Sequence, residues 1–484
     1  MNILIVGNGF DLSHYLPTKY DHFMDVMGAI EEKETGGLPD DLSVNTLEEW
    51  LKQIDGLFEH REDMAPPPHH MKFDELFNKT RDPKFIGKTK EYYLTENIEI
   101  CAKDVLKLQY RLEMNSWYQY FSDHVREVKT WIDFEQKIEH VLLIIGEKLF
   151  DCEMIDSESA YLEYFNGDSG IKAKVNNFDI KILDQFKLIV KEVRIRNMKP
   201  VSPKYSNNQP IHAPWWNINK EFCYGNKLEN GFSVGGFINY LMDQLEEFIK
   251  IFDRYLELVI SQLNLKCLFK IESECWKHPD KIFSFNYTNT FQRIHDSVKI
   301  EFLHGRHGEQ QNIVLGISDL ENDALKKLKA YGFTKYHQKL FKDTDYLFLD
   351  KLKEKVKNHK RRIEYFEKDF GDKDPIAKKF ERQRIMEQES KLDLNFYIWG
   401  HSLDVSDKDY IIDLFSLNDD LDRNVRVIVY YFDKPAKFSL LNNLLAILEK
   451  DKVEQWMKNK WLVFKPNPEI KFAIENAENL DQVS

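Results

Sequence analysis

A few short apolar runs, separated by long polar stretches, constrain the fold of this chain more than any other feature. They lie at residues 3–6, 283–287, 300–303, 313–317, 395–400 and 425–432. Short, nearly continuous apolar runs are typical of parallel strands that are buried on both faces. Several of them end directly in Gly, Asn or Asp, the residue types that form ligand loops at the carboxyl edge of such a sheet. The sequence therefore predicts an α/β protein with a mostly parallel sheet.

The segments between these runs have a helical pattern. Apolar residues recur at three- and four-residue spacing among charges at 45–59, 96–150, 180–193 and 234–263. We expect a discontinuous core of residues 1–30, 276–320 and 394–445, with a large, mainly helical insertion at 31–275 and a charged helical insertion at 321–393. Residues 446–484 are expected to form a C-terminal helix and a tail. Within 351–384, mixed charges at helical spacing predict a solvated helical hairpin.

Charge and cysteine usage narrow the class of function. The formal net charge of -13 over 484 residues argues against generic nucleic-acid coating, although a local positive excess in 351–384 leaves a contact there open. No apolar stretch approaches the roughly 20 residues of a membrane span, so no membrane partner is expected. The five cysteines form no Cys-x-x-Cys pair and no His-Glu-x-x-His occurs, so no metal site is predicted. A reducing cytoplasm is the expected compartment.

The first apolar run continues directly into Gly7-Asn8-Gly9-Phe10-Asp11. A glycine permits a tight turn after a strand, and a second glycine lets a phosphate approach the backbone. The start of a following helix supplies N–H groups and a partial positive charge. The stretch fits a phosphate loop and a purely structural turn about equally. Asp11 has two candidate roles, a cap at the start of the helix and a carboxylate that faces the ligand.

Two later runs also end in polar side chains. Asn286 and Tyr287 end the run at 283–287, and an Asn at this place can bind a ribose or cap the next helix. His304-Gly305 ends the run that begins at 300. Because histidine titrates near neutral pH, His304 is a candidate general base. A lone buried histidine is, however, more often structural.

A fourth polar loop, Gly400-His401-Ser402, follows the run at 395–400. Gly400 and Ser402 suit a phosphate or a ribose, and Ser402 is equally suited to cap the next helix. The carboxyl ends of parallel strands share one edge of a sheet, so the four loops are expected to meet. Together they predict a nucleotide pocket, with Thr18 of the Leu-Pro-Thr segment lying over it.

These motifs resemble a known family. The segments GNGFDLSHYLPTKYDHF, FNYTNTF, FLHG and WGHSLDVSDKD occur in this order and look like the AbiH family of bacterial phage abortive-infection proteins. The resemblance extends from one end of the chain to the other in islands, of which 7–23 and 400–409 are the most specific. It implies a role in anti-phage defence.

The order of the motifs is also similar, more distantly, to the sirtuin-type (DHS-like) NAD-binding fold, which is Rossmann-like. This resemblance implies that Asn286 and His304 are a catalytic pair near the nicotinamide ribose, and Asp11 is a third candidate because a carboxylate stabilises developing positive charge. The expected cofactor-binding residues are Gly7, Asn8, Gly9, Phe10, Thr18, Tyr287, Gly305, Gly400, His401 and Ser402. The four-cysteine zinc module is absent, which argues against a protein deacylase.

The leading hypothesis is therefore an NAD glycohydrolase that halts phage growth by exhausting the infected cell. NAD is its substrate, and no metal is expected. The alternative is a non-catalytic sensor of a nucleotide or an NAD derivative. A third class, direct action on nucleic acid, has only the charges of 351–384 in its favour. Further expected partners are a phage-derived trigger and a second copy of the chain.

Overall fold

The computed structural model describes residues 1–34, 49, 52, 70–124, 131–155, 157–166, 175–196, 211–266, 268–271, 278–295, 298–344, 347–369, 375–421 and 425–473. Within this part of the chain, the main sheet has six strands: β1 (Asn2–Val6), β9 (Lys281–Ser284), β10 (Ile300–Phe302), β11 (Asn395–Trp399), β12 (Arg426–Tyr431) and β13 (Leu462–Pro466). All neighbouring pairs in it are parallel. The predicted α/β class with a parallel sheet is confirmed.

The strand order is β10–β9–β1–β11–β12–β13. Numbered along the chain, this is the 3-2-1-4-5-6 order of doubly wound sheets, in which the direction of winding reverses between the first and the fourth strand. That switch point lies between β1 and β11, where Val6 is in register with Trp399. Ligands of such sheets bind in the crevice outside the carboxyl ends of the strands at this point.

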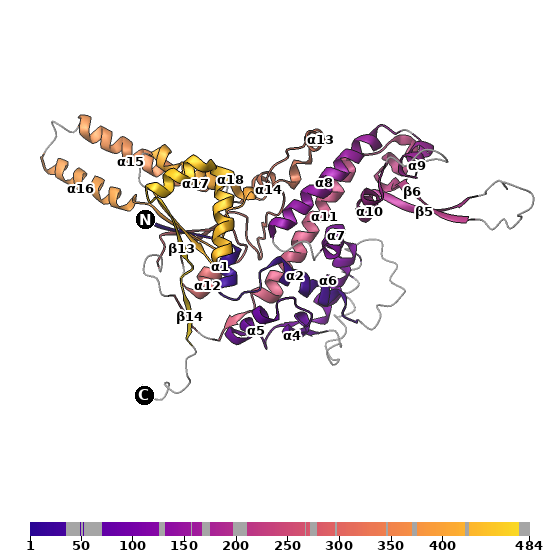
Figure 1. Cartoon of the computed structure of the whole chain (residues 1–484), viewed down its shortest axis with the longest axis horizontal. Helices are drawn as coiled ribbons and strands as arrows, with labels where there is room; N and C mark the ends of the chain where they lie inside the picture. Colours follow the sequence, from indigo (N-terminus) through magenta and orange to yellow (C-terminus); the bar gives the residue numbers. More distant parts are fainter. Residues whose placement is uncertain are drawn as a thin grey trace, which may run out of the picture.

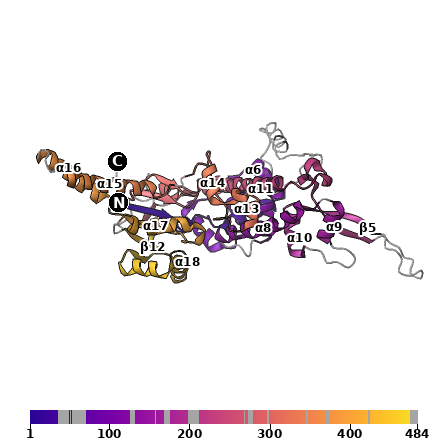
Figure 2. The same ribbon diagram turned by 90° about the horizontal axis from the view of Figure 1, so that it is seen from above.

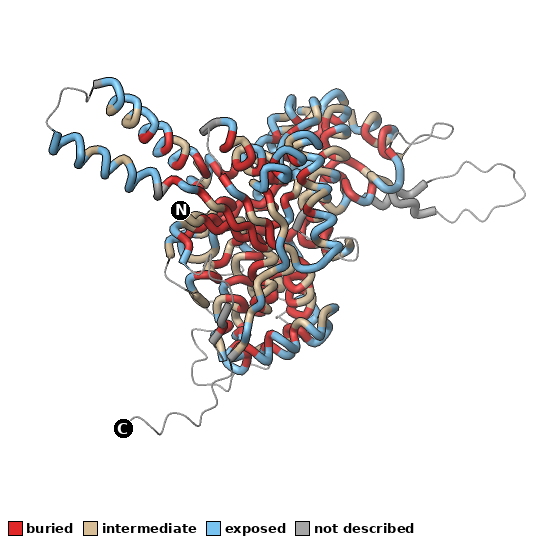
Figure 3. Tube along the Cα trace, turned by 60° about the vertical axis from the view of Figure 1, so that its left-hand side comes forward, coloured by how far each residue is buried: buried red, intermediate tan, exposed pale blue. Residues whose placement is uncertain are grey.

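The apolar runs are continuous because both faces of the sheet are covered. Successive side chains of a strand point to opposite faces, so Ile3 and Ile5 pack on one side and Leu4 and Val6 on the other. The first face is covered by α15 (Asp350–Asp369), α17 (Lys408–Leu421) and α18 (Lys434–Lys458). The second face is covered by α1 (Asn8–Ser13) and α12 (Thr290–Ile294). In Figure 3 the strands form the buried centre of this part of the molecule.

Among the described residues, the insertion between β1 and β9 is mainly helical. Its helices are α2 (Tyr20–Glu31), α4 (Phe73–Leu76), α5 (Pro83–Tyr92), α6 (Ala102–Met114), α7 (Ser116–Asp123), α8 (Trp131–Glu153), α9 (Glu158–Asn166), α10 (Asn177–Gln185) and α11 (Val234–Tyr255), which continues into η4 (Leu256–Ile260). Three two-stranded ribbons accompany them: β2 (Met71–Lys72) with β4 (Glu99–Ile100), β3 (Tyr93–Leu94) with β7 (Asn264–Leu265), and β5 (Ile189–Arg196) with β6 (Ile211–Ile218). The insertion has a large core rich in aromatic side chains, to which buried residues of 313–333 also contribute.

The second insertion contains α13 (Asp323–Lys327), η5 (Ala330–Phe333), α14 (Lys335–Phe341), α15 and α16 (Pro375–Lys391). The helices α15 and α16 form the predicted hairpin, and most of α16 is exposed (Figure 3). This hairpin extends from one end of an elongated molecule and the β5–β6 ribbon from the other (Figure 1, Figure 2). Helix α14, in contrast, lies between the sheet and the first insertion (Figure 1).

Two segments differ from the prediction. Residues 313–317 are buried but do not form a strand, because the amide and carbonyl of Leu315 hydrogen-bond to the Gln338 side chain at 3.0 and 2.9 Å. The C-terminal segment, for which only a helix and a tail are predicted, adds the edge strand β13. It also adds β14 (Ile470–Ala473), which pairs with β8 (Leu268–Ile271) of the first insertion.

Candidate functional site

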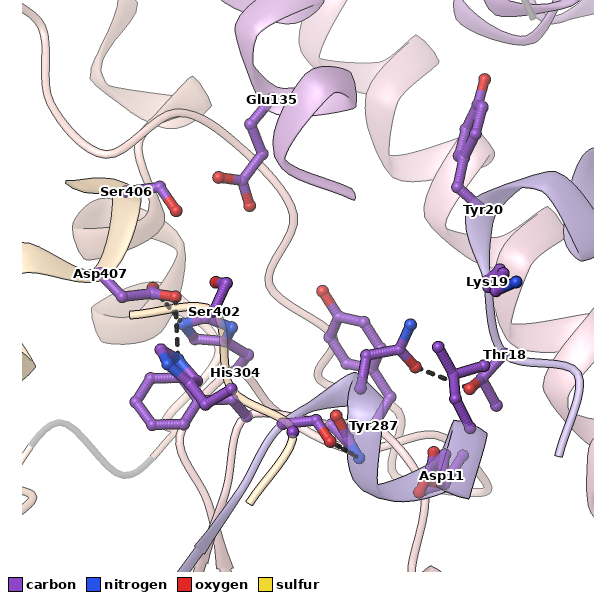
Figure 4. A pocket seen from close by; sticks show the side chains of 18 of the residues that line it. Asp11, Thr18, Lys19, Tyr20, Glu135, Tyr287, His304, Ser402, Ser406 and Asp407 are labelled. Carbon is purple, nitrogen blue, oxygen red and sulfur yellow. Dashed lines mark hydrogen bonds and ion pairs between the residues drawn. The ribbon is translucent and has the colours of Figure 1, made fainter. Parts of the chain in front are cut away.

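The loops that follow β1, β9, β10 and β11 converge on a cavity of about 300 Å³ at the switch point of the sheet (Figure 4). Ten of the residues predicted for the site line it: Gly7, Asn8, Asp11, Thr18, Asn286, Tyr287, His304, Gly400, His401 and Ser402. Gly9, Phe10 and Gly305 are not among the lining residues. The parallel sheet therefore does bring the four loops together at one edge.

The glycines are required where the first and fourth loops pack against each other. A Cβ on Gly9 would lie 2.7 Å from Gly400 Cα, and one on Gly400, where φ is +73°, would lie 2.1 Å from the Phe10 nitrogen. The amide of Gly9 donates to the Gly400 carbonyl at 2.8 Å, and that of Phe10 to the Gly7 carbonyl at 2.8 Å. Loop packing thus accounts for Gly9 and Gly400 without a phosphate. The backbone N–H groups of Gly9 and Phe10, which belong to the predicted phosphate loop, therefore donate hydrogen bonds within the protein.

Phe10 and Gly305 have structural positions. The Phe10 ring is buried on the second face of the sheet, with its centroid 5.0 Å from that of Trp399. Gly305 has a φ of +78° in a turn, and a Cβ there would lie 2.0 Å from the Asn312 carbonyl oxygen. Neither residue faces the cavity, although both belong to loops that do.

Polar side chains hold these loops in place. Asn286 Nδ2 donates to the Gly7 carbonyl at 2.9 Å, and Thr18 Oγ1 donates to Asn8 Oδ1 at 2.6 Å. The helix caps considered for Asn286 and Ser402 are not formed: Asn289 is the N-cap of α12, and Asp404 is the N-cap of η6 (Val405–Asp407). Asn286 and Ser402 line the cavity instead.

Asp11 is a buried carboxylate at the floor of the cavity. Its residue is 1% exposed, and Oδ2 accepts a hydrogen bond from Thr288 Oγ1 at 2.6 Å. Oδ1 has no hydrogen-bond partner among the described residues. Burial raises the pKa of Asp11 to about 6, partly offset by the Thr288 hydrogen bond. Asp11 does not cap α1, whose N-cap is Gly7.

His304 and His401 both approach Asp407, a residue of η6. The distance from His304 Nε2 to Asp407 Oδ1 is 3.1 Å, and that from His401 Nε2 to Asp407 Oδ2 is 3.3 Å. His401 Nδ1 accepts the Leu403 amide at 2.9 Å, so Nε2 carries the proton and faces the carboxylate. Burial lowers the pKa of His304 to about 3, although Asp407 opposes this shift. His304 is therefore neutral at neutral pH.

Two charged groups from the insertions complete the cavity. Lys335 of α14 hydrogen-bonds Asp407 Oδ1 at 3.3 Å and pairs with Glu135 Oε1 of α8 at 2.8 Å. Burial alone would raise the pKa of Asp407, but the charge of Lys335 and the contact with His304 lower it well below its usual value. Burial raises the pKa of Glu135, although Lys335 opposes the shift.

These charged groups are not predicted as site residues by the sequence. Asp407 lies in the WGHSLDVSDKD segment, so proximity to a motif is a signal that points to it. Glu135 has no such signal, because a single Glu in an amphipathic helix usually faces solvent. Among the described residues, no group of three His, Cys, Asp or Glu side chains is arranged to hold a metal ion.

The fold and the cavity define the class of protein: a doubly wound α/β protein with a ligand-sized, carboxylate-rich cavity at its switch point. The family model described as "Bacteriophage abortive infection AbiH" matches residues 3–431, and the chain belongs to this family. It is thus an abortive-infection protein of anti-phage defence, as the motifs predicted. No curated protein and no solved structure matches it. None of the described helices has the length and apolar composition that crossing a bilayer requires.

Proposed function

We propose that the cavity binds NAD or a related nucleotide, and that the chain hydrolyses the bond between nicotinamide and ribose. The observation that carries the proposal is the buried Asp11 carboxylate, whose unpaired Oδ1 lies at the floor of a cavity at the switch point. Cleavage of this bond passes through an oxocarbenium-like cation, which a carboxylate in a water-poor site stabilises. Similarity of motif order to the sirtuin-type NAD-binding fold supports the same substrate class.

The size of the cavity suits part of a dinucleotide. A volume of about 300 Å³ is at the lower end for ligand pockets, enough for the nicotinamide riboside half. The other half would extend toward solvent. The cavity is lined by more carboxylates than lysines. The positively charged nicotinamide ring therefore fits the interior of the cavity better than the negatively charged pyrophosphate does.

Each predicted catalytic residue has a role that fits its surroundings. Asp11 would stabilise the developing positive charge, and Asn286, fixed by its bond to Gly7, would orient the ribose or the carboxamide. His304 would polarise a ribose hydroxyl. A side chain with a pKa of about 3 is a weak base at neutral pH, so proton abstraction by His304 is not part of the proposal.

The test is to incubate purified protein with NAD and follow nicotinamide and ADP-ribose by chromatography. Release by the natural chain, and its loss in His304→Ala, would support hydrolysis at this cavity. Because Asp407 keeps Lys335 and His401 as partners, the variant should still fold, which circular dichroism would check. Equal release by both proteins would refute the role of His304.

The alternative is a sensor without turnover. The observation that favours it is the ion-pair chain from Asp407 through Lys335 to Glu135, which connects the sheet edge to both insertions across the cavity. A nucleotide bound in the cavity would therefore contact the sheet edge and both insertions at once. Saturable NAD binding by calorimetry, without nicotinamide release in phage-infected lysate, would favour the sensor over the hydrolase.

A further inference from the structure

Glu135 faces the cavity from the side opposite the sheet. It lies in the first part of α8, and its carboxylate points into the cavity (Figure 4). Its side chain retains 12% exposure, so the interior of the cavity is within its reach. Oε1 is paired with Lys335 Nζ at 2.8 Å, while Oε2 has no hydrogen-bond partner among the described residues. Oε2 is therefore the oxygen of this carboxylate that is left for a water or ligand in the cavity, and the Ser406 hydroxyl lies beside the carboxyl group.

The ion-pair chain leaves Glu135 as the less stabilised of two carboxylates. One ammonium group, Lys335, lies between Glu135 and Asp407. Asp407 has two imidazoles in addition, at 3.1 and 3.3 Å, whereas Glu135 has Lys335 as its only ion-pair partner among the described contacts. Burial penalises the charge of both carboxylates, and neighbouring groups offset this penalty more fully at Asp407 than at Glu135. Glu135 is the group in this network whose protonation changes most readily near neutral pH.

The other polar groups of the cavity are less suited to accept a proton. His304 Nε2 is directed at Asp407, and Asp11 Oδ2 accepts from Thr288 on the floor of the cavity. Glu135 and Asp11 come from different parts of the chain and lie on different sides of the space that a ribose would occupy (Figure 4). One carboxylate can thus stabilise the cation while the other acts on water.

We propose that Glu135 is the general base that accepts a proton from the attacking water in NAD hydrolysis, with Lys335 positioning its carboxylate. This inference rests on the proposed function. The bond between the anomeric carbon and the nicotinamide nitrogen breaks, and its electron pair leaves with neutral nicotinamide. The oxygen of water forms the new bond to that carbon. Glu135 takes one proton of the water and later releases it to solvent, which leaves ADP-ribose.

The experiment compares Glu135→Gln with the natural chain. Gln keeps the size of the side chain but cannot accept the proton, so kcat should fall about 10²- to 10⁴-fold while KM for NAD changes little. Protonation of Glu135 and protonation of Asp11 both contribute to the acidic limb of the kcat–pH profile, so this limb should be less steep in the residual activity, by one proton. Glu147→Gln is the control, because Glu147 is exposed on the same helix. It should match the natural chain.

The outcomes separate the two proposals. If the natural chain releases no nicotinamide, the proposed function fails and the role of Glu135 with it. If the natural chain is active and Glu135→Gln keeps its kcat, or keeps the same acidic limb, only the role of Glu135 is overturned. Should Glu135→Gln not fold, Glu135→Asp is used instead. Its shorter carboxylate should lower kcat but preserve the acidic limb, and an unchanged kcat would overturn the inference.

Discussion

The imidazole of His304 lies 3.1 Å from the carboxylate of Asp407, and both side chains are buried at the edge of the sheet. The two residues belong to loops that follow different strands, β10 and β11, on opposite sides of β1 in the sheet. Lys335 joins them from the second insertion. The three residues thus form one buried cluster in the lining of the cavity.

Replacing Asp407 should destabilise the protein strongly. Asp407→Asn removes the negative charge that balances the buried Lys335 and contacts His304 and His401. Loss of one partner in a buried ion pair costs about 3–5 kcal/mol when the remaining charge is left uncompensated. Because Glu135 still pairs with Lys335 at 2.8 Å, the expected cost lies at the lower end of this range. Urea unfolding at neutral pH would measure the change in the free energy of unfolding. A change within error would show that the cluster contributes little to stability.

Asp11→Asn tests the stabilisation of the cation. The amide has the shape of the carboxylate and can still accept from Thr288, so binding of NAD should be nearly unchanged. Turnover should fall about 10²- to 10³-fold, as is typical when a group that stabilises transition-state charge is lost. Calorimetry and nicotinamide release would measure the two effects. Asp243→Asn, an exposed change on α11, is the control, and equal turnover in both variants would contradict the role of Asp11.

Gly400→Ala should disrupt the contact between the first and fourth loops. The residue has a φ of +73°, and its new methyl group would lie 2.1 Å from the Phe10 nitrogen. Gly28→Ala is the matched change in α2, where nothing lies within 4 Å of the added Cβ. Helix propensity predicts that it stabilises by about 0.5–1 kcal/mol. Urea unfolding should therefore give opposite signs for the two variants, and the same sign would contradict the loop-packing explanation.

Acid should destabilise the protein below about pH 6.5, the ordinary pKa of histidine. Burial lowers the pKa of His14, His22 and His304 to about 3 and that of His295 to about 4. Between these values the unfolded chain binds more protons than the folded one, so stability falls as pH falls. Each histidine contributes roughly 1.4 kcal/mol per pH unit in this window. Asp11, whose pKa is raised to about 6, and Glu135, whose pKa burial also raises, oppose the trend, because each binds a proton more readily in the folded chain than in the unfolded one.

Unfolding in urea at a series of pH values from neutral to mildly acidic would measure this slope. His295→Gln should reduce it by the contribution of one histidine, because Gln does not titrate. It can also still donate to His14 Nε2, which lies 2.9 Å from His295 Nε2 in the natural chain. A stability that stays constant or rises as pH is lowered from neutral would show that these imidazoles are not held neutral by the fold.

The sequence by itself determined the class of fold and most of the polar residues that lie at the carboxyl edge of the sheet. The runs that became β1, β9, β10, β11 and β12 are apolar throughout because helices cover both faces of the sheet, and this pattern is visible without a structure. The polar residues after four of these strands had to meet, because parallel strands place their carboxyl ends at one edge. Asp11, Asn286 and His304 were predictable for this reason.

The tertiary structure alone decided which residues complete the cavity and which merely support it. Glu135 and Lys335 reach the site from two insertions, and the spacing of residues within a helix does not indicate which remote loop the helix will contact. In the same way, only the packing of the first loop against the fourth shows why Gly9 and Gly400 are glycines. A local pattern defines an element and its buried face. Contacts between distant segments depend on how the insertions fold back over the sheet, and that is a property of the whole chain.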